Sequence, residues 1–158
     1  MFKQAGTASH EPNLGAAYQV HLIDLLSDEH KLLLDGLDNS RRFLAHFKID
    51  DFDREIKLFK GRFQSHIMAE NLKLYLYLRI SLPQGSDQKK LAENMRLEMK
   101  EISKQVKSFH DTYGSGQLTP ALIYACETEL TKLRKLLGER FEQEERSLYP
   151  LYKRQAAA

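Results

Sequence analysis

The sequence predicts an all-α domain: an up-down bundle of four helices with a loose N-terminal arm. Apolar residues recur at steps of three and four along four long segments, which is the period of a helix. No segment alternates β-branched and polar residues as a half-buried strand would. Short stretches rich in Asp, Gly, Ser and Pro divide the four segments from one another, at 50–53, 81–87 and 113–120.

The length and composition fit one domain. With 158 residues, of which 42% are hydrophobic, the chain can bury one sizeable core. We place the bundle at residues 18–155 and a flexible arm at 1–17, where Pro12 and Gly15 interrupt small and polar residues. The chain shows no signal-peptide core and no run of about 18 uncharged apolar residues. We therefore expect a cytoplasmic protein, a monomer or homodimer, without membrane contact.

Charge and cysteine content exclude several functions. The 24 lysine and arginine residues nearly balance the 22 aspartate and glutamate residues, and no face is basic enough to follow a phosphate backbone. We expect no direct nucleic-acid contact. The single cysteine, Cys126, excludes an internal disulfide and lacks an evident activating base, so we expect a small core residue. The sequence offers no catalytic residues, and we predict that the protein is not an enzyme.

Polar residues interrupt three of the four apolar stripes that helical spacing predicts for the inward faces. The third stripe is apolar throughout: Leu91, Met95, Met99, Ile102, Val106, Phe109 and Tyr113. The second stripe is expected to end at Leu74 and Tyr77, and the fourth at Leu148 and Leu151. The interrupting residues are His30 on the first helix, His66 and Glu70 on the second, and Arg140 and Glu144 on the fourth.

These five residues are expected to form one polar layer, because an isolated ion is costly to bury. Arg140 can act as structural counter-ion to Glu70 and Glu144, with no cofactor, which is the arrangement we expect. Alternatively, one Fe, Mn or Zn ion can be held by both histidines and the carboxylates, since these donors suit such metals. The metal ligands would then be His30, His66, Glu70 and Glu144. The solvated flank of the fourth helix is expected to carry Glu142, Gln143 and Glu145.

The motifs around the layer resemble those of the hemerythrin-like HHE cation-binding bundles. In that family the first helix supplies a His, the second a His-x-x-x-Glu, the third a His and the fourth a His-x-x-x-Glu. The matching stretches here are "LLSDEH", "HIMAENLKLYLYL" and "RFEQEERSLYP". The resemblance implies ligand positions at His30, His66, Glu70 and Glu144. Met99 and Arg140 stand where the family offers further histidines, so we expect no oxygen-carrying di-iron centre.

The chain is also similar to the Rsd/AlgQ family of anti-sigma regulators, small four-helix proteins that bind the primary bacterial sigma factor. That family keeps a His in each of the first two helices, none in the third, and Arg-Phe-x-x-Glu in the fourth. The corresponding stretches are "LIDLLSDEHKLLL", "FQSHIMAENLKLYLYL", "LEMKEI" and "LRKLLGERFEQEE". This resemblance implies a transcription regulator that acts by protein–protein contact with a sigma factor. The alternative is a hemerythrin-like domain whose reduced, mononuclear site senses metal, oxygen or nitric oxide.

Overall fold

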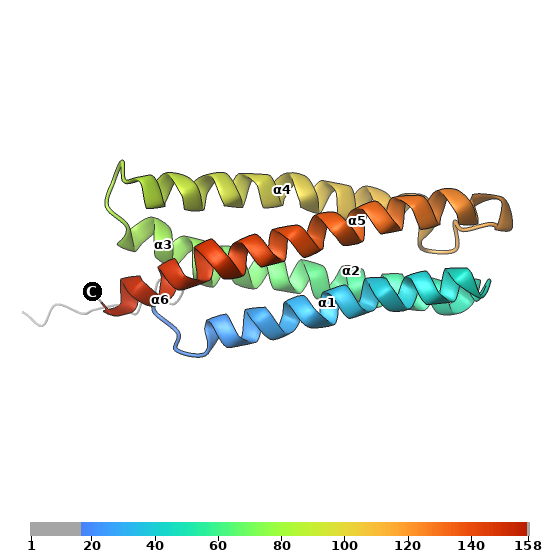
Figure 1. Cartoon of the computed structure of the whole chain (residues 1–158), viewed down its shortest axis with the longest axis horizontal. Helices are drawn as coiled ribbons and strands as arrows, with labels where there is room; N and C mark the ends of the chain where they lie inside the picture. Colours follow the sequence, from blue (N-terminus) through green and yellow to red (C-terminus); the bar gives the residue numbers. More distant parts are fainter. Residues whose placement is uncertain (1–16, 158) are drawn as a thin grey trace, which may run out of the picture.

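The computed structural model describes residues 17–157 and confirms the predicted all-α bundle. Four rods lie side by side (Figure 1). The first rod is α1 (Leu22–Ala45), and the third is α4 (Asp87–Tyr113). The second consists of α2 (Ile49–Ala69), the π-helical η1 (Glu70–Tyr75) and α3 (Leu76–Ser81). The fourth consists of the 3₁₀ turn η2 (Pro120–Leu122), α5 (Ile123–Gln143), the π-helical η3 (Glu144–Leu148) and α6 (Tyr149–Ala157).

The rods form a square. Both α1 and α4 pack against α2 and α5, so each rod has two close neighbours (Figure 1). Short loops join successive rods, which gives the up-down order. The predicted arm lies outside the described residues, apart from residue 17. None of the described helices is both long enough and apolar enough to cross a membrane.

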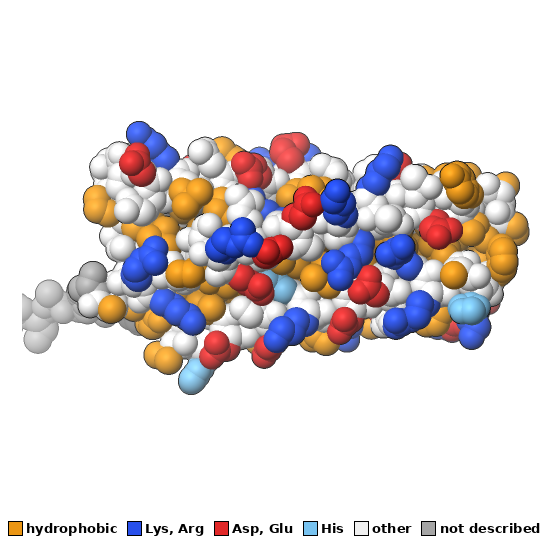
Figure 2. All heavy atoms as spheres, viewed as in Figure 1, with side chains coloured by type: hydrophobic (Ala, Val, Ile, Leu, Met, Phe, Trp, Pro, Cys, Tyr) orange, Lys and Arg blue, Asp and Glu red, His pale blue; other side chains and the backbone are white. Residues whose placement is uncertain are grey.

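Two of the predicted dividing stretches, at 50–53 and 81–87, lie at the starts of helices. Ser86 caps α4, since its hydroxyl accepts a hydrogen bond from the Lys89 backbone N–H at 3.2 Å. The stretch at 50–53 does not precede the second helix but forms its first turn, where Asp50 and Asp51 complement the positive end of the helix dipole. Over the face that α1 and α5 share, charges of both signs are interspersed, as the balanced composition predicts (Figure 2).

The core consists of two apolar clusters. One lies at the end of the bundle nearest the 46–48 turn and includes Leu33, Phe52 and Leu137. The other lies at the opposite end and includes Leu26 and Leu78. Along α1, α2 and α5, the interrupting polar residues fall between the stretches that build the two clusters. A polar layer therefore divides the core.

The third stripe is predicted correctly except at its start. Leu91 is exposed, and the neighbouring Ala92 is buried in its place. From Met95 to Phe109 every predicted inward residue of α4 is buried, and Tyr113 is half-buried. The small Ala92 side chain fills the position where α4 approaches the rim of the second apolar cluster.

The two π-helical segments shift the inward face by one residue. A π turn uses an i to i+5 hydrogen bond, so it adds a residue to the turn. After η1 the face moves from the expected Tyr77, which is only half-buried, to Leu78, which is fully buried. After η3 the predicted Leu148 and Leu151 are buried, and Tyr149 and Tyr152 join them.

Cys126 is buried within the first apolar cluster, as predicted. Burial raises the pKa of its thiol to about 12, so the thiolate is scarce at neutral pH. This cysteine packs as a small apolar side chain.

Adjacent leucines on α1 test the predicted face. Leu26 is fully buried and Leu25 is 51% exposed. Leu26→Ala should lower the free energy of unfolding by about 2–5 kcal/mol, because it leaves a cavity in the second apolar cluster. Leu25→Ala, the matched control, should change it by less than about 0.5 kcal/mol. Urea unfolding followed by circular dichroism measures both values, and equal losses would contradict the assigned face.

Candidate metal centre

The structure brings the five polar residues into one buried layer. His30 comes from α1, His66 from the last turn of α2, Glu70 from the start of η1, Arg140 from α5 and Glu144 from the start of η3. All five side chains are at least 96% buried. One donor atom from each histidine and each carboxylate lies within 4.8 Å of the other three.

Both histidines are oriented by a carboxylate on their outer side. Glu145 Oε1 lies 3.1 Å from His30 Nδ1, and Glu29 Oε2 lies 3.3 Å from His66 Nδ1. In a neutral ring, an Nδ1–H that donates outward leaves Nε2 with its lone pair toward the layer. Carboxylate–histidine pairs of this kind accompany metal-bound histidines and fix their tautomer.

Phe141 holds the His30 ring in place. The two rings stack, with centroids 3.9 Å apart and planes 7° from parallel. The His66 ring meets His30 edge-on, with centroids 4.8 Å apart. The imidazoles therefore have little freedom to rotate away from the layer, which is the preorganisation that a ligand site requires.

Tyr149 joins three of the candidate ligands. Its hydroxyl lies 2.9 Å from Glu70 Oε1, 3.0 Å from His30 Nε2 and 3.3 Å from Glu144 Oε2. Burial first, and then the two carboxylates, raise the pKa of this phenol, so it stays protonated and donates to one acceptor at a time. Tyr149 thus supplies one proton to a cluster that has several acceptors.

Three candidate ligand atoms have no hydrogen-bond partner within the described chain: His66 Nε2, Glu70 Oε2 and Glu144 Oε1. His66 Nε2 does lie 3.1 Å from Glu70 Oε1, but without the alignment of a hydrogen bond. Four ligands about 2.0–2.2 Å from one ion lie about 3.3–4.4 Å apart, depending on the geometry, so the set would contract from its present 4.8 Å when an ion binds. The residues present therefore fit a metal ion.

The pKa values of the two carboxyl groups shift in opposite directions. Burial raises the pKa of Glu70, but contacts with His30 and His66 outweigh burial and hold it well below its usual range. Burial and the charge of Glu70 raise the pKa of Glu144. Burial lowers the pKa of His66, yet the contact with Glu70 reverses this and leaves it raised. Without an ion, protons on these groups limit the negative charge of the layer.

Arg140 closes the layer on the side of α4 and points mostly away from the ligands. Its Nη1 lies 2.6 Å from Glu98 Oε2, and its Nη2 donates to the backbone carbonyl of Met95. Only Nε approaches a candidate ligand, at 3.7 Å from Glu144 Oε1, which is too long for a hydrogen bond. Within residues 17–157 Arg140 makes no ion pair with Glu70, so it serves as counter-ion chiefly to Glu98.

Sequence reasoning placed the five layer residues together but missed their supporting shell. Glu142, Gln143 and Glu145 are exposed, as expected for the solvated flank, but Glu145 also contacts His30 and Gln143 accepts a hydrogen bond from Arg140 at 3.3 Å. Glu29 and Tyr149 were not predicted to contact the layer either. The sequence does contain one signal for these carboxylates. Glu29 precedes His30 and Glu145 follows Glu144, so each lies next to a layer residue and can contact a neighbouring helix.

The second and fourth rods repeat one pattern across the layer. His66 and Arg140 are each followed by a glutamate four residues later and by a buried tyrosine five residues after that. The glutamate opens a π turn in both rods. The tyrosines differ, because the Tyr75 hydroxyl has no hydrogen-bond partner in the described structure whereas the Tyr149 hydroxyl has three neighbours. The two halves of the layer are alike in spacing but not in chemistry.

A comparison with known protein families matches residues 21–152 to the model described as "Hemerythrin HHE cation binding domain". This range includes every residue of the layer and both outer carboxylates. No curated protein and no solved structure gives a significant match to the chain. The comparisons lend no support to the resemblance to the Rsd/AlgQ regulators.

Replacing Arg140 tests whether its contacts stabilise the layer. Arg140→Met should lower the free energy of unfolding by about 1–3 kcal/mol, because the Met95 carbonyl loses its charged donor and Glu98 loses its ion-pair partner. The matched control is Arg146→Met, at a side chain that is 71% exposed and pairs with Glu142 on the same rod. It should cost less than about 0.5 kcal/mol. Urea unfolding without added metal measures the free energy of unfolding of both variants. An unchanged value for Arg140→Met would mean that the desolvation cost of the buried guanidinium cancels the stabilisation from its contacts.

Proposed function

The chain belongs to the hemerythrin HHE cation-binding family, and from this premise we propose that it binds one divalent transition-metal ion in the polar layer. The proposed ligands are His30, His66, Glu70 and Glu144. Two imidazoles and two carboxylates suit Fe, Mn or Zn. Arg140 is not a ligand in this proposal, since a guanidinium has no lone pair to offer at physiological pH.

The three unpartnered donor atoms carry the proposal. An unsatisfied buried polar atom costs about 1–3 kcal/mol, and three such atoms belong to candidate ligands on two rods. One cation that accepts a lone pair from His66 Nε2, Glu70 Oε2 and Glu144 Oε1 would satisfy all three. It would also release the proton that the raised pKa keeps on Glu144.

We propose one ion rather than two because two of the six ligand positions of the family pattern hold residues that cannot serve. Met99 lies on α4, buried in the first apolar cluster, where a histidine would be needed. Arg140 occupies the corresponding corner of α5, and its fixed positive charge repels a second cation. Its contacts with Glu98 and Met95 hold that charge at the edge of the layer.

The surrounding residues suit a binding or sensing role. When bound, a four-donor ion of the iron or manganese type keeps coordination positions for a small ligand such as dioxygen or nitric oxide. Glu29 and Glu145 would keep both imidazoles in the ligand tautomer. The Tyr149 hydroxyl would donate a hydrogen bond at the same centre. The apolar clusters on both sides exclude water.

Metal content tests this proposal. Protein produced in medium replete with iron, zinc and manganese should carry about one metal ion per chain, since the donor set holds a single centre. Elemental mass spectrometry measures this content. His66→Ala removes an imidazole and should reduce that content at least about tenfold. The ion should also raise the melting temperature of the metal-free protein, because it binds only the folded state.

His46→Ala is the matched control for that experiment. His46 is exposed at the C-terminal end of α1, outside the layer, so its replacement should leave the metal content unchanged. A metal-free wild-type protein under replete conditions would contradict the proposal. Equal metal content in the His66→Ala variant would contradict the assigned ligands.

We also propose, as a second and separate function, contact with a bacterial sigma factor. The observation that favours it is the Arg-Phe-x-x-Glu spacing of Arg140, Phe141 and Glu144, which the chain shares with the Rsd/AlgQ regulators that it resembles. This function requires no catalysis, and recognition would use the exposed helix faces. Immobilised intact protein should retain purified primary sigma factor, whereas an unrelated four-helix protein should not. Failure to retain it, with or without metal, would remove this second proposal and leave the first untouched.

A further inference from the structure

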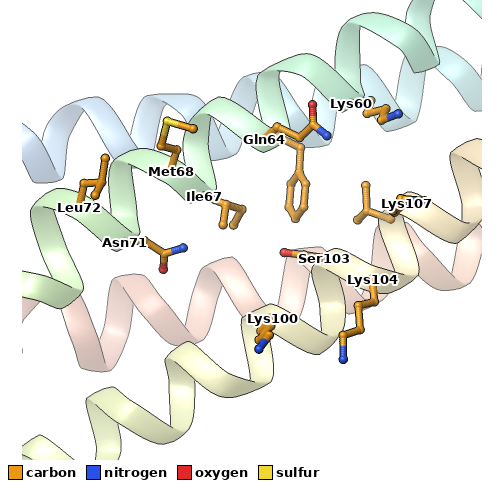
Figure 3. Close-up of a pocket in the computed structure, with 12 residues that line it drawn as sticks. Lys60, Gln64, Ile67, Met68, Asn71, Leu72, Lys100, Ser103, Lys104 and Lys107 are labelled. Carbon is orange, nitrogen blue, oxygen red and sulfur yellow. The ribbon is translucent and has the colours of Figure 1, made fainter.

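A groove of about 670 Å³ opens between the second rod and α4, away from the polar layer's ligands (Figure 3). Its floor is apolar and includes the buried Phe63 and Val106 and the half-buried Ile67. The volume lies within the range of about 300–1,000 Å³ that is typical of small-molecule sites in proteins.

Lysines border this apolar floor. Lys100, Lys104 and Lys107 follow one another at helical spacing along the α4 side, and Lys60 stands on the α2 side. No acidic side chain lines the groove, so its potential is positive. Its chemistry is therefore complementary to a ligand that is both anionic and apolar.

Two of these lysines have no carboxylate partner within residues 17–157. Lys104 pairs with Glu101 at 2.9 Å and Lys107 with Asp111 at 2.7 Å, whereas no ion pair is formed by Lys60 or Lys100. Lys60 is also the only half-buried member of the set; its ammonium group lies 3.5 Å from a ring nitrogen of His110. Lys60 is therefore the cation with most to gain from an incoming anion.

Charge and apolar surface are separated along the groove. Lys60 and Lys107 lie at one end of the view in Figure 3, and Leu72 lies at the other. At the Leu72 end the second-rod side carries Met68 and Leu72, which are 63% and 54% exposed. A ligand with one acidic head and one apolar tail matches this order.

We propose that the groove binds a long-chain carboxylate of the fatty-acid class, with the carboxylate beside Lys60 and Lys107 and the alkyl chain along Phe63 and Ile67 toward Leu72. A slender alkyl chain reaches the floor between two neighbouring rods. Four lysines and no acidic side chain line the groove, so a single acidic head on an apolar chain complements both its charge and its floor. Charge complementarity therefore favours the long-chain carboxylate.

Fluorescent cis-parinarate, a long-chain carboxylate, is the probe. It should gain fluorescence with the full-length protein below its micelle concentration, and palmitate should displace it. Hexadecanol lacks the negative charge and should displace the probe at least about fivefold less effectively than palmitate does. Hexadecyltrimethylammonium should displace it still less, because lysines line the groove. Equal competition by all three amphiphiles would overturn the proposal.

Three variants locate the site. Lys60→Glu reverses the key charge and should weaken cis-parinarate binding about tenfold. Lys132→Glu, at an exposed lysine on α5, makes the same change in net charge and should alter binding less than twofold. Ser103→Phe fills the groove from the α4 side and should weaken binding by at least about tenfold, with circular dichroism verifying the fold.

Other occupants give distinct results. Unchanged binding by both Lys60→Glu and Ser103→Phe would place the probe elsewhere and overturn the proposal. Displacement by a designed helical peptide of Leu and Glu, but not by palmitate, would make the groove a protein-docking surface and overturn it as well. Loss of probe binding as the chain dimerises at higher concentration would indicate a second copy as the occupant, with the same consequence.

Discussion

The buried polar layer sets the constraint on which the rest of the structure depends: charged groups from three rods must be balanced in a space that excludes water. Glu70 and Glu144 are both fully enclosed, and two adjacent unpaired carboxylates would be prohibitive there. The bundle meets this constraint with imidazole contacts that lower the pKa of Glu70 and with a raised pKa at Glu144, which favours the uncharged form of that carboxyl group. The layer also divides the core into two apolar clusters, so its contacts fix the alignment of the rods across the whole bundle.

The π turns bring Tyr75 and Tyr149 to the buried face of their rods. In an α-helix, residues four apart share a face, and a tyrosine five residues after a glutamate would point partly away from it. Because η1 begins at Glu70 and η3 at Glu144, the i+5 residues in both rods become buried instead. Tyr149 uses its position to reach Glu70 and His30. The irregularity in the backbone is thus part of the site, in keeping with the frequent occurrence of π turns at functional positions.

The sequence predicted the bundle, the four rods and the five layer residues because helical period and the cost of burying charge are both visible in it. It did not predict the π turns, since a single extra residue in a turn leaves no trace in an apolar stripe that continues on both sides. The misplaced Tyr77 follows from this. Glu29 and Glu145 were missed for another reason. Each lies one residue from a layer residue in sequence, and the histidine that it contacts comes from a different rod. Contacts between rods, and the direction in which Arg140 turns, depend on packing that periodicity does not encode.

Arg140 shows how one residue can separate a fold from the chemistry usually associated with it. It has the same spacing to its glutamate and tyrosine as His66 has, so the backbone keeps the pattern of a ligand position while the side chain cannot serve as one. Had the guanidinium turned inward, it would have neutralised Glu70 and Glu144 and removed any need for a cation. It turns mainly outward, to Glu98 and the Met95 carbonyl, and only its Nε approaches Glu144 Oε1, at 3.7 Å. Glu70 Oε2 and Glu144 Oε1 therefore have no hydrogen-bond partner in the described structure. The direction of the Arg140 side chain, as much as the presence of the histidines, leaves the layer able to accept the single ion that we propose.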